Sequence, residues 1–293
     1  MADKWEAYYS RQFLPWDSGT PSSQLTAFLT SCLPQPSACA SSNSNNSQPP
    51  SLKELISQAE AAPVALPPEA TAAGCDQQLP QLHACERCAA FKPRAGGSVL
   101  ELGCGTGASA VWLARQGFQV TGVDIVQAAL DAASSKAAAA GLPGDNPRFI
   151  LQDIMQLCAG DSSQPGNGST PSSKSSSGSS RSLGTFDLIY DCQVYHALVK
   201  DDTAAQAKLP LLLHSLLKPG GLLLLLTGNA NEPEIGPAVL SGEQLLAPLV
   251  YSGLVCVFLR QSRFDSTPHY VDVLGKRPLA WLLLLLLEET NPR

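Results

Sequence analysis

Short apolar runs alternate along the chain with stretches of helical periodicity, which predicts an α/β protein. Buried strands are expected at 99–102, 119–123, 148–151, 186–191, 222–226, 254–258 and 282–287. Helices are expected between them, at about 108–116, 126–140 and 242–251, and glycines suited to a left-handed cap follow the first two, at Gly117 and Gly141. Runs such as Leu222–Leu226 are apolar at every position, which favours strands buried on both faces of a doubly wound sheet.

Two polar tracts interrupt this pattern. Residues 34–50 are rich in proline, serine and asparagine, and residues 159–184 are rich in serine and glycine, so neither has the apolar period of a packed segment. We therefore expect an N-terminal arm at 1–33, a low-complexity insert with short helices at 34–94, and one large domain at 95–293. The tract at 159–184 is expected to be a disordered insertion in that domain.

Composition narrows the class of protein. The chain has 293 residues, of which 44% are hydrophobic and 15% charged, enough for one sizeable α/β core. A net charge of -6 argues against a broad basic surface for nucleic acid. The leucine runs fall far short of the ~20 residues of a membrane span, and the N-terminal residues lack the apolar stretch of a signal peptide. We expect a cytoplasmic protein with free thiols that binds neither a membrane nor nucleic acid.

One pair of the nine cysteines has the spacing of metal ligands. Cys85-x-x-Cys88 lies near Cys75 and His83, which permits a zinc site. A single such pair without a second one is a weak signal, and a helical turn carrying two inert thiols explains it as well. We therefore expect no metal ion.

The segment Glu101-Leu-Gly103-Cys-Gly105-Thr-Gly107 follows the first expected strand and precedes a helix. Three glycines at alternate positions leave the turn bare, so its N–H groups and the helix N-terminus can lie against a bound molecule. The second strand ends at Asp124, about 20 residues after the first glycine, which is the spacing at which an acid binds ribose hydroxyls. The pattern predicts a ligand that contains a nucleoside.

Two cofactors fit this turn, and the charge of Glu101 separates them. Gly103, Gly105 and Ala108 also satisfy the G-x-G-x-x-G/A fingerprint of dinucleotide-binding proteins, so a dehydrogenase is the competing interpretation. A carboxylate two residues before the first glycine repels a pyrophosphate and attracts a cation. The segment resembles the first motif of the class I S-adenosylmethionine-dependent methyltransferases, and Asp124 resembles the acid of their second motif.

This resemblance implies a Rossmann-like, doubly wound α/β sheet of seven strands, mostly parallel with an antiparallel last strand. It also implies S-adenosyl-L-methionine as the cofactor. In that family an acid and an apolar residue after the third strand contact the adenine, and the matching positions here are Asp153 and Ile154. The cofactor-binding residues that we expect are Trp16, Glu101, Gly103, Gly105, Gly107, Asp124, Ile125, Asp153 and Ile154.

The N-terminal arm carries a second resemblance. The segments Trp5-Glu-Ala-Tyr8-Tyr9 and Phe13-Leu-Pro15-Trp16-Asp17-Ser-Gly19-Thr-Pro21 are similar to the arm of the thiopurine and halide/thiol S-methyltransferase-like group. An aromatic, proline-rich arm of this kind can close over the cofactor and exclude water from the transfer. The competing interpretation is that Phe13 and Trp16 only pack the arm onto the domain.

Polar and aromatic residues follow the fourth expected strand, at the sheet edge where a ligand is expected. Among them, His196 is the candidate base, and Tyr195 and Asp191 are the further candidate catalytic residues. A histidine that is only hydrogen-bonded in place at a helix start is the alternative. The tetrapeptide Asn/Asp-Pro-Pro-aromatic is absent here, which disfavours amides and exocyclic amines as acceptors.

Together these features predict an S-adenosylmethionine-dependent methyltransferase with a small-molecule acceptor. A thiol or a halide is favoured because no compelling base constellation is present, and a thiol is appreciably ionised near neutral pH. Two alternatives stay open, namely a protein methyltransferase and a non-catalytic S-adenosylmethionine-binding protein. The identity of the acceptor and the oligomeric state do not follow from the sequence.

Overall fold

The computed structural model describes residues 2–30, 50–66, 93–157, 183–233 and 238–289. The residue pair Cys85-x-x-Cys88 and nearly all of the tract at 159–184 lie outside these ranges. The strands are β1 (Ser98–Leu102), β2 (Gln119–Asp124), β3 (Arg148–Leu151), β4 (Phe186–Cys192), β5 (Leu217–Asn229), β6 (Val239–Leu240), β7 (Val255–Arg263) and β8 (Leu279–Leu286). The helices are α1 (Ala2–Ser10), α2 (Ser23–Thr30), α3 (Leu52–Ala61), α6 (Ala108–Arg115), α7 (Gln127–Ala139), α8 (Ile154–Leu157), α9 (Tyr195–Val199), α10 (Thr203–Leu216), α11 (Gly242–Tyr251) and the π-helical η2 (His269–Val273).

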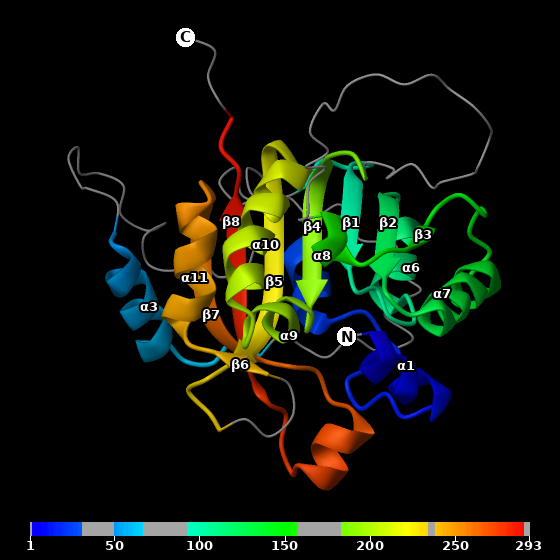
Figure 1. The fold of residues 1–293 in the computed structure, drawn as a ribbon, viewed down its shortest axis with the longest axis horizontal. Coiled ribbons are helices and arrows are strands. Elements are labelled where there is room, and N and C mark those ends of the chain that lie inside the picture. The colour runs from blue at the N-terminus through cyan, green and yellow to red at the C-terminus, as the bar shows by residue number, and fades with distance from the viewer. Residues whose placement is uncertain (1, 31–49, 67–92, 158–182, 234–237, 290–293) are drawn as a thin grey trace, which may run out of the picture.

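One sheet forms the centre of the described chain (Figure 1). Its strand order is β3-β2-β1-β4-β5-β8-β7, and the two-residue β6 pairs with β5. The first five strands of this order are parallel, whereas β8 runs antiparallel to both of its neighbours. The predicted Rossmann-like α/β fold is therefore confirmed. The pattern did not predict β6, because two residues show no periodicity.

Strand β5 is longer than the apolar run that predicted it. Its pairing with β8 continues past Leu226, where Thr227 lies opposite Trp281 and Gly228 opposite Ala280. Backbone pairing does not require apolar side chains, so hydrophobic periodicity marks only the buried centre of a strand.

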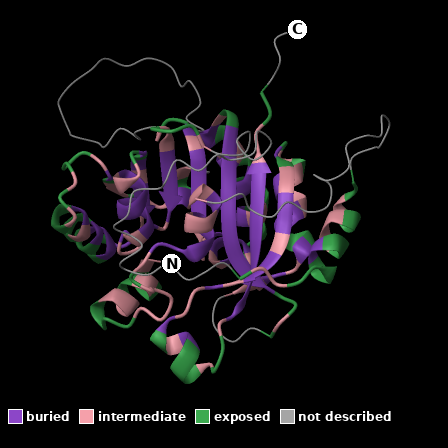
Figure 2. Ribbon diagram, turned by 180° about the vertical axis from the view of Figure 1, so that it is seen from behind, coloured by how far each residue is buried: buried purple, intermediate pink, exposed green. Residues whose placement is uncertain are grey.

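Alternate residues of the strands pack into two separate cores. In β5, Leu223 and Leu225 belong to the core beneath α3 and α8–α11, whereas Leu222 and Leu224 belong to the core beneath α2 and α6. Figure 2 shows the strands buried along most of their length. Side chains of successive strand residues point to opposite faces, so a run of leucines is what a sheet covered on both faces requires.

The N-terminal arm lies across the carboxyl ends of the parallel strands, at the same end of the sheet as η2 (Figure 1). Long-range hydrogen bonds hold it there. Thr267 Oγ1 donates to the carbonyl of Pro15 at 2.8 Å, and the backbone N–H of Ser23 donates to Asp265 Oδ2 at 2.8 Å. None of the described helices is both long enough and apolar enough to cross a membrane.

A truncation in the centre of the sheet tests this packing. Leu224 is 0% exposed in the core beneath α2 and α6, whereas Leu211 on α10 is 59% exposed. We expect Leu224→Ala to lower the free energy of unfolding by about 2–5 kcal/mol, because the cavity that it leaves cannot fully collapse. The control Leu211→Ala should change it by at most about 0.5 kcal/mol. Urea unfolding followed by circular dichroism measures both values, and equal losses would contradict the described core.

Candidate functional site

The glycine turn after β1 is shaped by close packing. Gly103, Gly105 and Gly107 have φ of 53°, 52° and 76°, in the left-handed region that disfavours side chains. A Cβ on Gly103 would lie 2.4 Å from Cγ2 of Val194, and one on Gly107 would lie 2.7 Å from Cβ of Ala133. The turn is therefore held tightly between the segment that follows β4 and helix α7.

Glu101 lies beneath this turn and is 6% exposed. Burial raises its pKa to about 8, a rise that the backbone N–H of Ala110 opposes and the charge of Asp124 increases. Among the described residues, Glu101 Oε2 has no hydrogen-bond partner. A buried carboxylate oxygen without a partner is costly, so this position is arranged for a ligand that donates hydrogen bonds or carries positive charge.

Asp124 connects the end of β2 to the glycine turn. Its Oδ2 accepts a hydrogen bond from the backbone N–H of Gly105 at 2.9 Å, and its Oδ1 accepts one from Val126 N–H at 3.0 Å. Burial raises the pKa of this carboxyl above its usual value. Each oxygen has a further lone pair, so the carboxylate can still accept hydrogen bonds from ribose hydroxyls.

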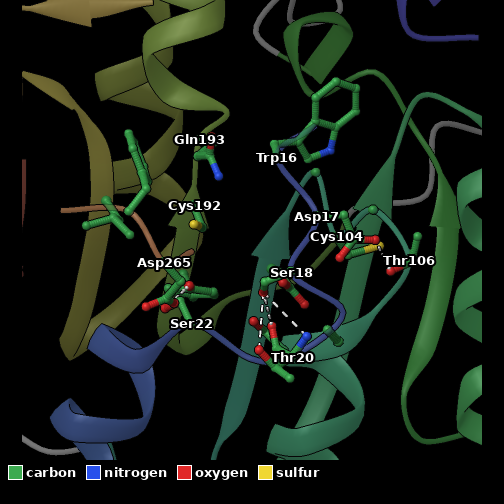
Figure 3. A pocket seen from close by; sticks show the side chains of 18 residues that line it. Trp16, Asp17, Ser18, Thr20, Ser22, Cys104, Thr106, Cys192, Gln193 and Asp265 are labelled. Atoms are coloured by element: carbon green, nitrogen blue, oxygen red, sulfur yellow. Dashed lines mark hydrogen bonds between the residues drawn. The ribbon is translucent and has the colours of Figure 1, made fainter. Parts of the chain in front are cut away.

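Two adjoining hollows lie at the carboxyl ends of the parallel strands. The larger one, here the main cavity, has a volume of about 610 Å³, and the smaller inner pocket about 100 Å³ (Figure 3). The main cavity is within the usual range of ligand sites, about 300–1,000 Å³. Both hollows are lined by Trp16, Gly103, Gly105, Cys192 and Gln193.

Most of the predicted cofactor residues line these hollows. Glu101 lines the inner pocket, and the main cavity is lined by Asp124, Ile125, Asp153 and Ile154. Asp153 also caps the following turn, since its Oδ1 accepts a hydrogen bond from Met155 N–H at 2.9 Å. Gly107 lines neither hollow. It must lack a side chain because it packs closely against Ala133 of α7.

The arm supplies aromatic walls to the main cavity. Trp16 packs edge-on against Trp5 and Tyr8, with ring centroids 5.1 and 5.0 Å away. The neighbouring Asp17 fastens the arm to the glycine turn, because its Oδ2 accepts a hydrogen bond from Thr106 Oγ1 at 2.7 Å. Lys136 Nζ of α7 donates to the same hydroxyl at 3.0 Å.

The three candidate catalytic residues are buried on either side of the turn that follows β4, with Asp191 near the end of β4 and Tyr195 and His196 at the start of α9. Asp191 is 0% exposed and accepts hydrogen bonds from the backbone N–H groups of Val194 and Tyr195, at 3.4 and 2.9 Å. Burial raises the pKa of Asp191 to about 7. Tyr195 is 0% exposed and lines neither hollow.

His196 is the only one of the three that borders the main cavity. Its Nδ1 accepts a hydrogen bond from the backbone N–H of Gly228 at 2.8 Å. Burial, with a smaller contribution from the charge of Lys200, lowers the pKa of His196 to about 3. These contacts count against a proton-accepting role, because the lone pair that would take the proton is already engaged.

The structure also brings residues to the site that the sequence did not assign. Tyr9 of α1 reaches the glycine turn, where its hydroxyl would lie 3.2 Å from a Cβ on Gly105. His269 and Tyr270 of η2 line the main cavity from the far end of the chain. The aromatic cluster of the arm was visible in the sequence, but its distance from the glycine turn along the chain hid the contact.

Comparison with known proteins agrees with this architecture. Residues 99–164 match the sequence model of the family described as "Methyltransferase domain". This part of the chain is therefore similar to a methyltransferase domain. The match covers the glycine turn, Asp124, Asp153 and the first three strands, which is the half of the sheet that bears the expected cofactor residues.

Several proteins are similar to parts of this chain. A ubiquinone biosynthesis O-methyltransferase of Xanthomonas euvesicatoria pv. vesicatoria is 30% identical over 189 residues, covering 64% of this chain and 61% of that protein. An S-adenosyl-L-methionine-dependent Diels-Alderase (iccD) of Talaromyces variabilis is 47% identical over 63 residues, or 22% of each chain. The chain thus spans at most 61% of the length of these curated relatives.

One solved structure matches nearly the whole chain. Reported as "Conversion of a Disulfide Bond into a Thioacetal Group during Echinomycin Biosynthesis", it is 18% identical, covers 99% of this chain and 94% of its own, and has a TM-score of 0.56. At this identity the likeness shows a shared fold.

The buried carboxyl of Glu101 makes a testable contribution to stability. The pKa is 4.5 ordinarily and about 8 in the fold, so between these values the folded chain holds a proton that the unfolded chain has lost. Stability from this group is therefore fully present below about pH 4.5 and falls as the pH rises toward 8. We expect Glu101→Gln to remove this fall, so that the variant gains stability relative to wild type as the pH rises.

Thermal unfolding of the ligand-free protein at several pH values between 5 and 8 measures the difference. The exposed Glu288→Gln serves as the control and should keep the wild-type pH dependence. Parallel curves for wild type and Glu101→Gln would contradict a protonated, buried carboxyl.

Proposed function

We propose that this protein transfers a methyl group from S-adenosylmethionine to a small-molecule acceptor, with thiols and halides as the preferred class. The observation that carries the proposal is the junction of the two hollows at Trp16, Gly103 and Gln193. One hollow is lined by Glu101, whose Oε2 has no hydrogen-bond partner among the residues described, and the other has aromatic walls. A cationic cofactor and an apolar acceptor would meet at this junction.

The cofactor side is assigned from charge and shape. Glu101 would receive the ammonium group of the cofactor, and Asp124 its ribose hydroxyls. Ile125 and Ile154 would flank the adenine, with Asp153 near its amino group. The bare backbone at Gly103 and Gly105 would allow close approach. When bound, S-adenosylmethionine supplies an electrophilic methyl group on a sulfonium centre.

The acceptor side is assigned from the arm and η2. Tyr8, Phe13, Trp16 and Tyr270 line the main cavity and offer flat apolar faces. These walls suit an uncharged ring or alkyl group and exclude water from the junction. Alignment of the acceptor with the methyl group would supply most of the catalysis, an effect worth up to about 7–11 kcal/mol in intramolecular reactions.

The choice of thiols and halides follows from the engaged state of the candidate bases. Asp191 is used by backbone N–H groups, and His196 Nδ1 by Gly228. A halide has no proton to lose, and a thiol loses its proton near neutral pH with little help. We therefore assign Asp191 and His196 to holding the turn after β4 in place, and Tyr195 to its packing.

A panel of acceptors tests the proposal. The purified protein is incubated with labelled S-adenosylmethionine and, separately, with thiophenol, iodide, catechol, aniline and a cell extract. We expect S-adenosylhomocysteine to form with thiophenol and iodide. Turnover only with catechol or aniline would contradict the acceptor class, and label on extract protein would favour a protein methyltransferase. Cofactor binding without turnover on any acceptor would contradict an enzyme.

A charge-removing variant tests the cofactor side. We expect Glu101→Gln to weaken S-adenosylmethionine binding by about 10–100-fold, because a hydrogen bond to a charged group contributes roughly 1.5–3 kcal/mol. Since the pKa of the ligand-free carboxyl is about 8, wild type should also release a proton on binding near pH 7. Calorimetry in buffers of different ionisation enthalpy measures both effects, with Glu288→Gln as the control. An affinity within twofold of wild type would reject the assignment.

A further inference from the structure

Gln193 lies at the junction of the two hollows in a backbone conformation that glutamine rarely adopts. Its φ is +71°, in the left-handed region, and it follows β4 directly. Such conformations persist only where the surroundings impose them, and they gather at functional sites. This strained residue lines both hollows.

Three contacts impose the conformation. The backbone N–H of Gln193 donates to the carbonyl of Leu226 at 3.0 Å, which ties the turn to β5. The next residue, Val194, packs against the glycine turn so closely that a Cβ on Gly103 would lie 2.4 Å from it. The following backbone N–H groups are held by Asp191. The turn therefore cannot relax without disturbing the cofactor side.

The side chain of Gln193 is held at one end and open at the other. Tyr270 OH of η2 donates to Gln193 Oε1 at 2.9 Å. Among the described residues no group accepts a hydrogen bond from the Nε2 amide. Figure 3 shows the amide of Gln193 at the pocket edge, near Cys192 and across from Trp16. The amide thus presents two N–H donors where an acceptor molecule would lie.

We propose that Gln193 determines acceptor specificity by donating a hydrogen bond to an electron-pair-bearing atom adjacent to the reacting atom of the acceptor. Tyr270 is a positioning residue, because it acts through the Gln193 amide. This inference rests on the proposed methyltransferase function and refines its substrate class. The favoured acceptor is a flat molecule that carries a ring nitrogen or carbonyl oxygen next to the nucleophilic sulfur.

Isomeric thiols test the position of that atom. Pyridine-2-thiol carries its ring nitrogen beside the carbon that bears sulfur, whereas pyridine-4-thiol carries it across the ring. We expect wild type to prefer the first isomer by about 3–10-fold in kcat/KM, the range of one neutral hydrogen bond. Gln193→Met keeps the length of the side chain and removes the amide, so it should abolish the preference and leave the affinity for S-adenosylmethionine unchanged. Tyr270→Phe should reduce the preference partly, and should have no further effect in a Gln193→Met background.

The strain provides a second readout that does not depend on turnover. Asparagine tolerates positive φ better than glutamine, but its shorter side chain gives up the hydrogen bond from Tyr270 OH, so Gln193→Asn should reduce the preference and raise Tm less than relief of strain alone would. Gln12 is a matched control, because it has φ of +53°, is exposed and lines neither hollow. Gln12→Asn should raise Tm by about 2–4 °C and keep wild-type acceptor selectivity.

The outcomes separate this inference from the proposed function. If wild type turns over both isomers equally, or if Gln193→Met and Gln193→Asn keep the preference, the inference is overturned and the methyltransferase proposal stands. A loss confined to cofactor affinity would also overturn it. If wild type binds S-adenosylmethionine but turns over no acceptor, the proposed function fails and the inference fails with it.

Discussion

The hydrogen bond from Gly105 N–H to Asp124 Oδ2 is the interaction on which the site depends. It fixes the glycine turn against the end of β2, while the other oxygen of Asp124 holds the N–H of Val126 before α7. The same turn leaves room at Gly103 for Val194, so the segment after β4 can pack directly on it. The ends of the adjacent strands β2, β1 and β4 are thereby packed together into one edge of the sheet. The candidate ligand-binding residues are positioned relative to this edge.

This edge gathers carboxyl groups where an ordinary core would have none. Glu101 and Asp191 are buried, Asp124 is partly buried, and burial raises the pKa of each of them. The charges of Asp124 and Asp191 raise the pKa of Glu101 further, whereas that of Lys136 lowers it. Backbone N–H groups bond to the carboxyl oxygens of Asp124 and Asp191, but Glu101 Oε2 has no hydrogen-bond partner in the part of the chain that the structure describes. Such an arrangement stores unfavourable energy that a cationic ligand would relieve, and a pyrophosphate would make it worse.

The sequence was informative wherever the structural constraint is local. Leucine runs marked strands covered on both faces, and the spacing from Gly103 to Asp124 marked two residues that meet at one edge of the sheet, because both follow from strand periodicity and turn geometry. It was not informative about the direction of side chains after β4. His196 follows the strand as a catalytic residue would, yet its ring turns toward β5 and engages Gly228. That orientation depends on the register between β4 and β5, which brings Gly228 close to His196.

The N-terminal arm is a second case in which the sequence did not reveal the contacts. Its aromatic residues were recognisable, but its contacts are to Asp265, Thr267 and Thr106, all of them far along the chain. These contacts place residues of the arm and η2 along the same cavity as the glycine turn. In the proposed function the acceptor lies against the arm and η2, so substitutions at Phe13, Trp16 or in η2 would change the acceptor without disturbing the hydrogen bond between Gly105 and Asp124.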